Sequence, residues 1–330
     1  MQIEPLETIT RLGLSDCDVS PDGQAVAAPY QEDDGFRLGV WFTRACNWLA
    51  DLLLPGPYHE PRFAPGGRRL AARQDGEEVT VWSLPEGREL FARYRQGGAQ
   101  MAALAFGPEG ETVAIAQGDR LGLFAVGDGS ALGSLAMPAQ VRALRSSADG
   151  RLLAVGLEAG GAVVADLEGP QVMAALPGID QPVNTLSFHP QRPWLLAATT
   201  PSFAVVGGRP RRTGHGWAEV WNYETGQRIA RVPCDYQAAL LGQGEYLATL
   251  TNNSRSLWVW QIPQQELVAH IEEVVPELLI DDQGHETRRA TLAASAAGDV
   301  LAVAGLSRPV SAAGVLRLYA FQMEAVPRAQ

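Results

Sequence analysis

The sequence contains no lysine: all 26 basic residues are arginine. We expect a bacterial source. A genome of high GC content would favour Arg, Ala, Gly and Pro codons, and this bias would explain the absence of lysine. Alternatively, ε-amines are selected against because the protein works beside enzymes that modify lysine, as an adaptor that offers them no target of its own. The sequence leaves both explanations open.

Long apolar runs, paired cysteines and a surplus of positive charge are also lacking. No apolar run is long enough to span a membrane, and the N-terminal segment MQIEPLETITRL has acidic residues where a signal peptide needs a basic start. The three cysteines, Cys17, Cys46 and Cys234, are odd in number and far apart, which is typical of reduced thiols in a cytoplasmic protein. The net charge of −11 argues against general nucleic-acid binding.

A turn followed by a short apolar segment recurs along the whole chain. SPDGQAVAA at Ser20 is the clearest copy, and the later copies begin at Ala64, Gly107, Ser147, His189, Gly242 and Ala296. The intervals run from 40 residues (Gly107 to Ser147) to 54 residues (Gly242 to Ala296), which is the length of a four-stranded unit. The chain therefore contains seven copies of one structural unit.

In each unit, turn residues separate four short segments that are expected to be strands. One apolar segment precedes the turn, as in MAALAF (101–106), and a second follows it, as in TVAIA (112–116). A third segment ends near an aromatic residue, and a fourth follows another turn. The aromatic recurs once in most units, which indicates packing; the series is Trp41, Trp82, Phe124, Trp221, Trp260 and Tyr319.

The second strand of each unit is apolar at consecutive positions, as in LAVG (153–156) and LAVA (301–304). Continuous apolar runs are typical of strands covered on both faces, so each small sheet must lie between two neighbours. The sequence therefore predicts an all-β fold, a single seven-bladed β-propeller of four-stranded antiparallel blades over residues 1–330.

An open ring would leave two unpaired sheet edges. The segment after the third strand of the last unit, QMEAVPRAQ, contains Pro327 and is a poor ladder strand. We therefore expect the N-terminal segment LETITRL (6–12) to supply the outer strand of blade 7 and to close the ring.

The units resemble the WD-repeat β-propeller family. The resemblance rests on the SPDG turn and on the strand ends VWS, VWN and VWQ at Trp82, Trp221 and Trp260, and it spans essentially the whole chain. The Asp that follows this Trp in the family is replaced in all three, and the family's Gly-His pair is missing. Because that His usually belongs to a hydrogen-bond network inside each blade, we expect these blades to be held mainly by packing and ladder bonds.

Function in a propeller concentrates in the connections between strands. The long connections 31–37, 201–216, 272–289 and 306–314 are expected on one face of the neighbouring blades 5, 6, 7 and 1. They predict a non-catalytic scaffold or adaptor that binds a protein or peptide within a larger assembly, although insertions also drift harmlessly into surface loops. The candidate partner-binding residues are Arg209, Arg211, Arg212, His215, Glu32, Asp33, Asp34, Leu278, Leu279 and Arg308.

The charges of two of these connections are opposite. Arg209, Arg211 and Arg212 could bind a carboxylate or phosphate in forked geometry. The same arginines could instead meet the acidic residues of the 272–289 segment within the molecule, or remain solvated.

The signals for catalysis are weak. DDQGHE (281–286) could hold a metal or small molecule through Asp281, Asp282 and His285 at the central funnel, which makes a ligand-binding or enzymatic propeller the alternative function. HEPRF at His59 begins like a zinc-protease helix, but Pro61 and the missing second His argue against one. His189 is expected to be structural. We therefore expect no enzyme and assign no catalytic residue, cofactor or metal.

Overall fold

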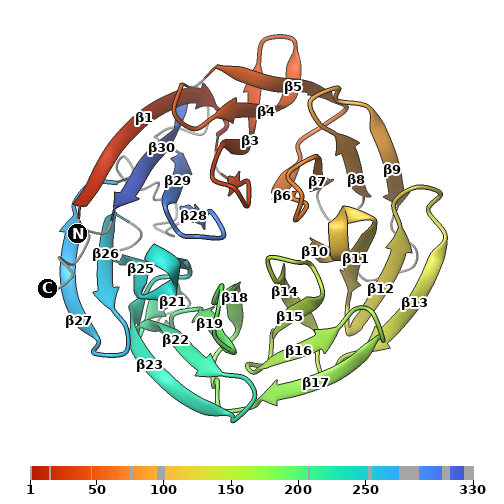
Figure 1. Cartoon of the computed structure of the whole chain (residues 1–330). Coiled ribbons are helices and arrows are strands. Elements are labelled where there is room, and N and C mark those ends of the chain that lie inside the picture. The colour runs from red at the N-terminus through yellow and green to blue at the C-terminus, as the bar shows by residue number, and fades with distance from the viewer. Residues whose placement is uncertain are drawn as a thin grey trace, which may run out of the picture.

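The computed structural model describes residues 2–14, 16–45, 47–74, 78–94, 101–206, 209–251, 255–274, 290–306 and 313–322. Seven four-stranded antiparallel blades, of which the last and the first share one continuous sheet, stand around a central axis and confirm the predicted seven-bladed propeller (Figure 1). In the described part of the chain, no helix is long and apolar enough to cross a membrane.

The blades follow one another in chain order. Blade 1 contains β2 (Asp18–Val19), β3 (Ala25–Glu32), β4 (Gly35–Phe42) and β5 (Trp48–Leu54). Blade 2 contains β6 (His59–Phe63), β7 (Arg69–Gln74), β8 (Glu78–Ser83) and β9 (Glu89–Tyr94). Blade 3 contains β10 (Met101–Phe106), β11 (Thr112–Gln117), β12 (Arg120–Ala125) and β13 (Ala131–Ala136). Blade 4 contains β14 (Val141–Ser146), β15 (Leu152–Leu157), β16 (Ala162–Asp166) and β17 (Gln171–Leu176).

Blade 5 contains β18 (Val183–Phe188), β19 (Trp194–Thr199), β22 (Gly216–Asn222) and β23 (Gln227–Cys234), with β20 (Phe203–Val206) and β21 (Arg209–Arg212) inserted. Blade 6 contains β24 (Ala238–Leu241), β25 (Tyr246–Thr251), β26 (Ser256–Gln261) and β27 (Glu266–Ile271). Blade 7 contains β28 (Thr291–Ala294), β29 (Val300–Leu306), β30 (Ala313–Gln322) and β1 (Gln2–Leu12). Short 3-10 turns, η1 (Pro108–Gly110) and η2 (Gly242–Gly244), precede β11 and β25.

The N-terminal strand closes the ring, as predicted. β1 pairs antiparallel with β30 from Gln2 opposite Gln322 to Leu12 opposite Ala313, so it begins earlier than the expected Leu6. Leu12 also pairs with Gln31 of β3, which joins blade 7 to blade 1. The strands β1 and β30 therefore hold blades 7 and 1 in one continuous sheet.

The hydrophobic core lies between neighbouring blades. The second strands are buried along most of their length, as the continuous apolar runs predict. Trp41 is 2% exposed and packs with Val26 of its own blade and with Ala302 and Leu318 of blade 7. The recurring aromatics thus fill the spaces between sheets.

The seven repeated turns lie on one face of the ring, which we call the turn face. Where a serine begins the turn, its hydroxyl accepts a main-chain N–H: Ser20 Oγ accepts from Ala25 at 2.9 Å, and Ser147 Oγ accepts from Leu152 at 2.9 Å. Neighbouring turns also bind each other, because the Gly242 N–H donates to the Gly298 carbonyl at 3.0 Å. The repeated turn therefore joins blades as well as strands.

Glycine is required where these turns meet. Gly298 has a φ of +69°, and a Cβ there would lie 2.5 Å from Leu241 Cα of the preceding blade. A Cβ on Gly150 would lie 2.5 Å from the Gly107 carbonyl oxygen. Both positions need the left-handed backbone and the absence of a side chain.

Blade 5 contains a buried polar network in addition to packing and ladder bonds. Glu219 is 3% exposed; it accepts a hydrogen bond from Trp221 Nε1 at 3.0 Å and pairs with Arg228 at 3.3 Å and Arg231 at 3.0 Å. The buried carboxylate is compensated by two cations and an indole N–H, as buried charge requires.

Ring closure by β1 predicts a large loss of stability when this strand is removed. Deleting residues 1–12 is expected to reduce the free energy of unfolding by roughly 5 kcal/mol or more, because it exposes the β30 edge and the core beneath it. Ile9→Ala, at the buried position of β1, is expected to cost about 2–4 kcal/mol. Thr8→Ala is the exposed control and is expected to cost less than about 0.5 kcal/mol. Urea unfolding measures all three, and an unchanged stability after the deletion contradicts closure by β1.

Candidate functional site

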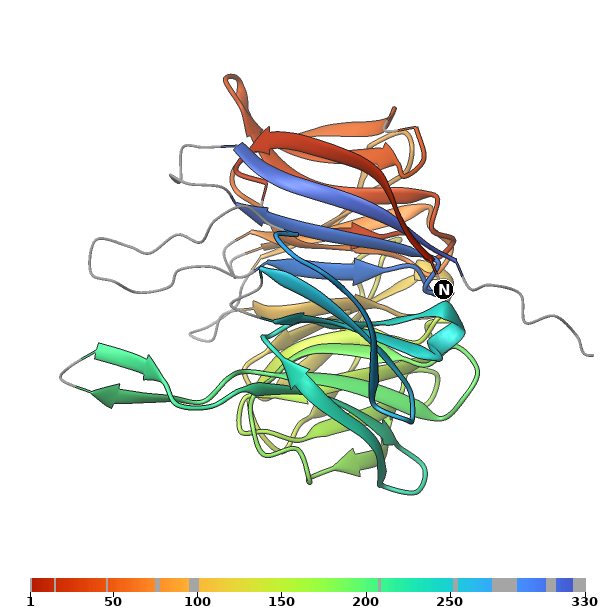
Figure 2. The same cartoon turned by 90° about the vertical axis from the view of Figure 1, so that its left-hand side faces the viewer.

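The inserted segment of blade 5 is a β-hairpin and not an irregular loop. Within the predicted connection 201–216, β20 pairs with β21 from Phe203 opposite Arg212 to Val206 opposite Arg209. Figure 2 shows this hairpin projecting from one side of the ring. We call this side the hairpin face. Arg209, Arg211 and Arg212 all lie on β21, and His215 follows it, with its carbonyl near the Gln181 amide at 3.4 Å.

The acidic residues of blade 1 lie at the turn between β3 and β4. Arg37 forms ion pairs with Asp34, with Asp51 at 2.5 Å and with Glu32 at 3.5 Å. The hydrogen bond from Arg37 lowers the pKa of Asp34 below its ordinary value. Glu32 and Asp34 are thus partly neutralised within the molecule, so the turn is less acidic than its sequence indicates.

The hairpin and the acidic turn both join the second and third strands of their blades. Blades 6 and 7 lie between them in the ring. The predicted residues Leu278, Leu279 and Arg308, and the alternative metal set Asp281, Asp282 and His285, lie outside the described residues. Clustering of the long connections therefore stays a prediction.

Sequence reasoning missed a charged central channel. Two cavities of about 540 and 780 Å³ occupy its two ends, and both are lined by Arg145, Thr185 and Leu292. Between them Arg145 Nη1 of blade 4 binds Asp18 Oδ1 of blade 1 at 3.1 Å, and Asp18 Oδ2 also accepts the Phe63 N–H at 2.9 Å. Blades 1 and 4 lie across the ring from each other, so this ion pair bridges the channel.

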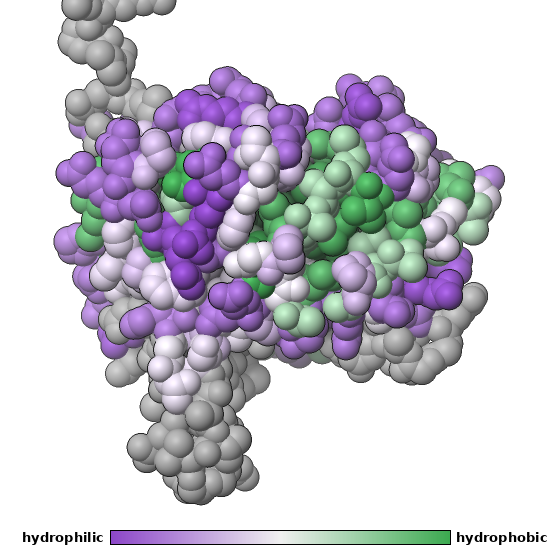
Figure 3. Space-filling view, turned by 90° about the horizontal axis from the view of Figure 1, so that it is seen from below, coloured by the Kyte–Doolittle hydropathy of each residue, from purple (hydrophilic) through white to green (hydrophobic). Residues whose placement is uncertain are grey.

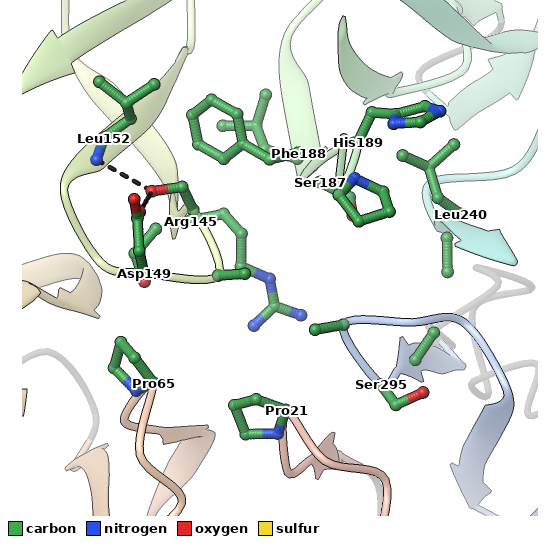
Figure 4. Close-up of a pocket in the computed structure, with 18 of the residues that line it drawn as sticks. Pro21, Pro65, Arg145, Asp149, Leu152, Ser187, Phe188, His189, Leu240 and Ser295 are labelled. Atoms are coloured by element: carbon green, nitrogen blue, oxygen red, sulfur yellow. Dashed lines mark hydrogen bonds between the residues drawn. The ribbon is translucent and has the colours of Figure 1, made fainter. Parts of the chain in front are cut away.

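The smaller cavity opens on the turn face. Figure 4 shows Pro21, Pro65 and Ser295 around its mouth and the Arg145 guanidinium reaching into it. His189 Nδ1 accepts the N–H groups of Gln191 and Arg192, each at 3.0 Å. Burial, helped by the positive charge of Arg192, lowers the pKa of His189 to about 4. His189 is therefore neutral at physiological pH. Its two hydrogen bonds stabilise the turn, which is the structural role that the sequence predicts.

The larger cavity opens on the hairpin face, because Gln140 and Tyr236 of the connections between blades line it. Four arginines also line it: Arg62 and Arg73 of blade 2, and Arg142 and Arg145 of blade 4. Although burial opposes its charge, the carboxylates of Asp18, Glu60 and Asp16 raise the pKa of Arg62. The cavity therefore presents permanently charged guanidinium groups.

The carboxylates of this cavity are already engaged. Asp16 accepts the N–H groups of Cys17 at 2.8 Å and Glu60 at 2.7 Å, and burial raises its pKa. Glu60 binds Arg73 Nε at 3.1 Å, and Glu158 binds Arg142. Among the described residues, no three His, Cys, Asp or Glu side chains gather as a metal site would require.

A signal for the channel was present in the sequence. First strands such as MAALAF (101–106) and AALL (238–241) are apolar, whereas HEPRF (59–63), VRALRS (141–146) and the short strand at Asp18 carry charges. In the structure HEPRF and VRALRS are β6 and β14, so the zinc-helix pattern at His59 is correctly rejected. Charged side chains of an innermost strand are expected to face the channel, because apolar side chains fill the spaces between the blades.

The outer edges of blades 3 and 4 form a second unusual surface. β13 and β17 contain no charged residue, whereas the outer strand of every other blade has at least one. Leu132, Val172 and Met173 are 53%, 48% and 57% exposed. Figure 3 shows the apolar patch on the side of the ring where β17 forms the edge. We call these two strands the apolar rim. Charges normally protect such edges.

No family model matches the chain, and the comparison with curated proteins finds no significant sequence match. Solved structures do match, among them the Cps50 (Swd1) β-propeller domain of Myceliophteria thermophila, with a TM-score of 0.72 and 14% sequence identity. The alignment covers 97% of this chain and all of that domain. At this identity the likeness shows a β-propeller fold alone, and a propeller supports many functions.

The ion pair across the channel predicts energetic coupling between opposite blades. Arg145→Gln is expected to cost about 2 kcal/mol, less than a fully buried pair because the Arg145 side chain is 26% exposed. The double variant Asp18→Asn with Arg145→Gln is expected to cost less than the sum of the single changes, because each single change leaves its partner's charge unpaired and the double variant does not. Urea unfolding of the four proteins measures this coupling. Additive costs would contradict the bridge.

Proposed function

We propose that the protein is a non-catalytic scaffold or adaptor that binds a protein or peptide through the hairpin face. The observation that carries this proposal is the blade 5 insertion. β20 and β21 form a separate two-stranded sheet outside the four strands of the blade. Blade 5 has its four strands without β20 and β21, so the hairpin is not needed for the strand pairing of the ring. It projects where a partner can reach it (Figure 2).

The chemistry of the hairpin favours an acidic or phosphorylated partner segment. Three of the four residues of β21 are arginine, and arginine binds carboxylate and phosphate groups in forked geometry. The wider docking surface over blades 5, 6, 7 and 1 is part of the proposal and includes the acidic turn at Asp33. Pairing of these arginines with the 272–289 segment is the competing arrangement.

The broader assignments rest on the sequence. They are membership of the WD-repeat family, a bacterial source, a cytoplasmic location and a role in a larger assembly. The absence of lysine supports a narrower role, in which the protein brings clients to a lysine-modifying or degrading enzyme without being modified itself. The fold likeness to the Cps50 (Swd1) domain is compatible with a protein-binding ring.

The proposal predicts that partner binding depends on the hairpin. A variant in which residues 203–212 are replaced by a short Gly-Ser turn is expected to keep the melting temperature, because blade 5 keeps its four strands. Partners captured by the intact protein are identified by mass spectrometry, purified and titrated against both forms. The variant is expected to bind at least about tenfold more weakly.

Two further variants locate the interaction. Neutralising only the arginines, with Arg209→Ser, Arg211→Ser and Arg212→Ser, is expected to reproduce the loss if the partner is acidic. Val172→Glu with Met173→Glu changes the apolar rim and is expected to leave the affinity unchanged. Retention of every partner by the shortened hairpin, with loss in the rim variant, would refute docking at the hairpin.

A further inference from the structure

The larger channel cavity has more hydrogen-bond donors than its own acceptors can use. Its four arginines each carry several N–H groups. Arg73 donates its Nε to Glu60, and Arg145 donates Nη1 to Asp18. Arg142 uses Nε for Asn184, at 2.7 Å, and Nη1 for Glu158. The remaining N–H groups of these side chains have no acceptor among the described residues.

Arg62 shows the surplus most clearly. Its Nη1 donates to the Pro61 carbonyl at 2.9 Å, and its buried Nε has no hydrogen-bond partner within the described parts of the chain. The nearby carboxylate of Asp16 is occupied by two main-chain N–H groups. This Nε is closed to solvent, so a ligand in the cavity would instead reach the N–H groups of Arg73, Arg142 and Arg145, whose side chains are partly exposed.

We propose that this cavity binds a small anion with phosphate or carboxylate groups, held by Arg62, Arg73, Arg142 and Arg145. The volume of about 780 Å³ is within the range of small-molecule sites. The arginines come from blades 2 and 4, which flank blade 3, so they approach a ligand from two directions. A metal cation is disfavoured because the carboxylates are already bound to arginine or to main-chain N–H groups.

This site is independent of the hairpin, so its test does not depend on the scaffold proposal. Isothermal titration calorimetry of the full chain with inorganic pyrophosphate and, separately, with citrate is expected to show saturable binding of at least one probe. The same probe is expected to raise the melting temperature by mass action. Binding of pyrophosphate alone would assign a phosphate ligand, and binding of citrate alone a carboxylate ligand.

Matched variants test the residues. Arg142→Gln is expected to weaken binding by about tenfold or more, and Arg142→Lys by less, because it keeps the charge but loses the fork. Arg69→Gln is the control: Arg69 is similarly half-buried and pairs with Glu111 at 2.6 Å, outside the cavity. Circular dichroism verifies that each variant is folded. No saturable binding of either probe, or equal weakening by Arg69→Gln, would overturn the proposal.

Discussion

The close approach of neighbouring turns on the turn face determines the geometry of the ring. Gly298 meets the backbone of Leu241 in the preceding blade, and main-chain hydrogen bonds join the two turns. Each turn leads directly into the buried second strand of its blade. Fixing the turns therefore fixes how the sheets stack, how their aromatic residues interleave and which residues of the innermost strands face the channel. β1 completes this arrangement by joining the last blade to the first.

Much of this architecture could be predicted from the sequence because it is local and repeated. The turn at Ser20, the continuous apolar strands and the terminal segment at Leu6 each carry a signal within a few residues. The Arg145–Asp18 pair could not be predicted in this way, because its partners come from opposite blades and meet only when the ring closes. The apolar residues Val172 and Met173 look like core residues in sequence and become exposed only because β17 is an edge. The hairpin has a local signal in the sequence, the Gly207-Gly208 pair, which favours a two-residue turn between strands.

The two proposals assign different tasks to one face. The hairpin projects from the face on which the larger channel cavity opens. If both proposals hold, a partner docked on the hairpin would lie close to the mouth of an anion site lined by Arg62 and Arg142. The ring itself would remain rigid, because its blades are joined at the turn face, across the channel by Asp18 and Arg145, and at the β1 closure. In this arrangement, added elements such as the hairpin recognise a partner and the repeated blades provide stability, as is common in propellers.

Replacement of two turn glycines by alanine tests most directly whether interlocked turns hold the ring. Gly67 and Gly298 have φ values of +68° and +69°, so a side chain brings nearly the same backbone strain at both. A Cβ on Gly67 would meet nothing within 4 Å, whereas one on Gly298 would lie 2.5 Å from Leu241 Cα. Urea unfolding is expected to show a cost of about 1–2 kcal/mol for Gly67→Ala. The expected cost for Gly298→Ala is roughly 2 kcal/mol greater, because the neighbouring backbone must move. Equal losses for the two variants would contradict the account.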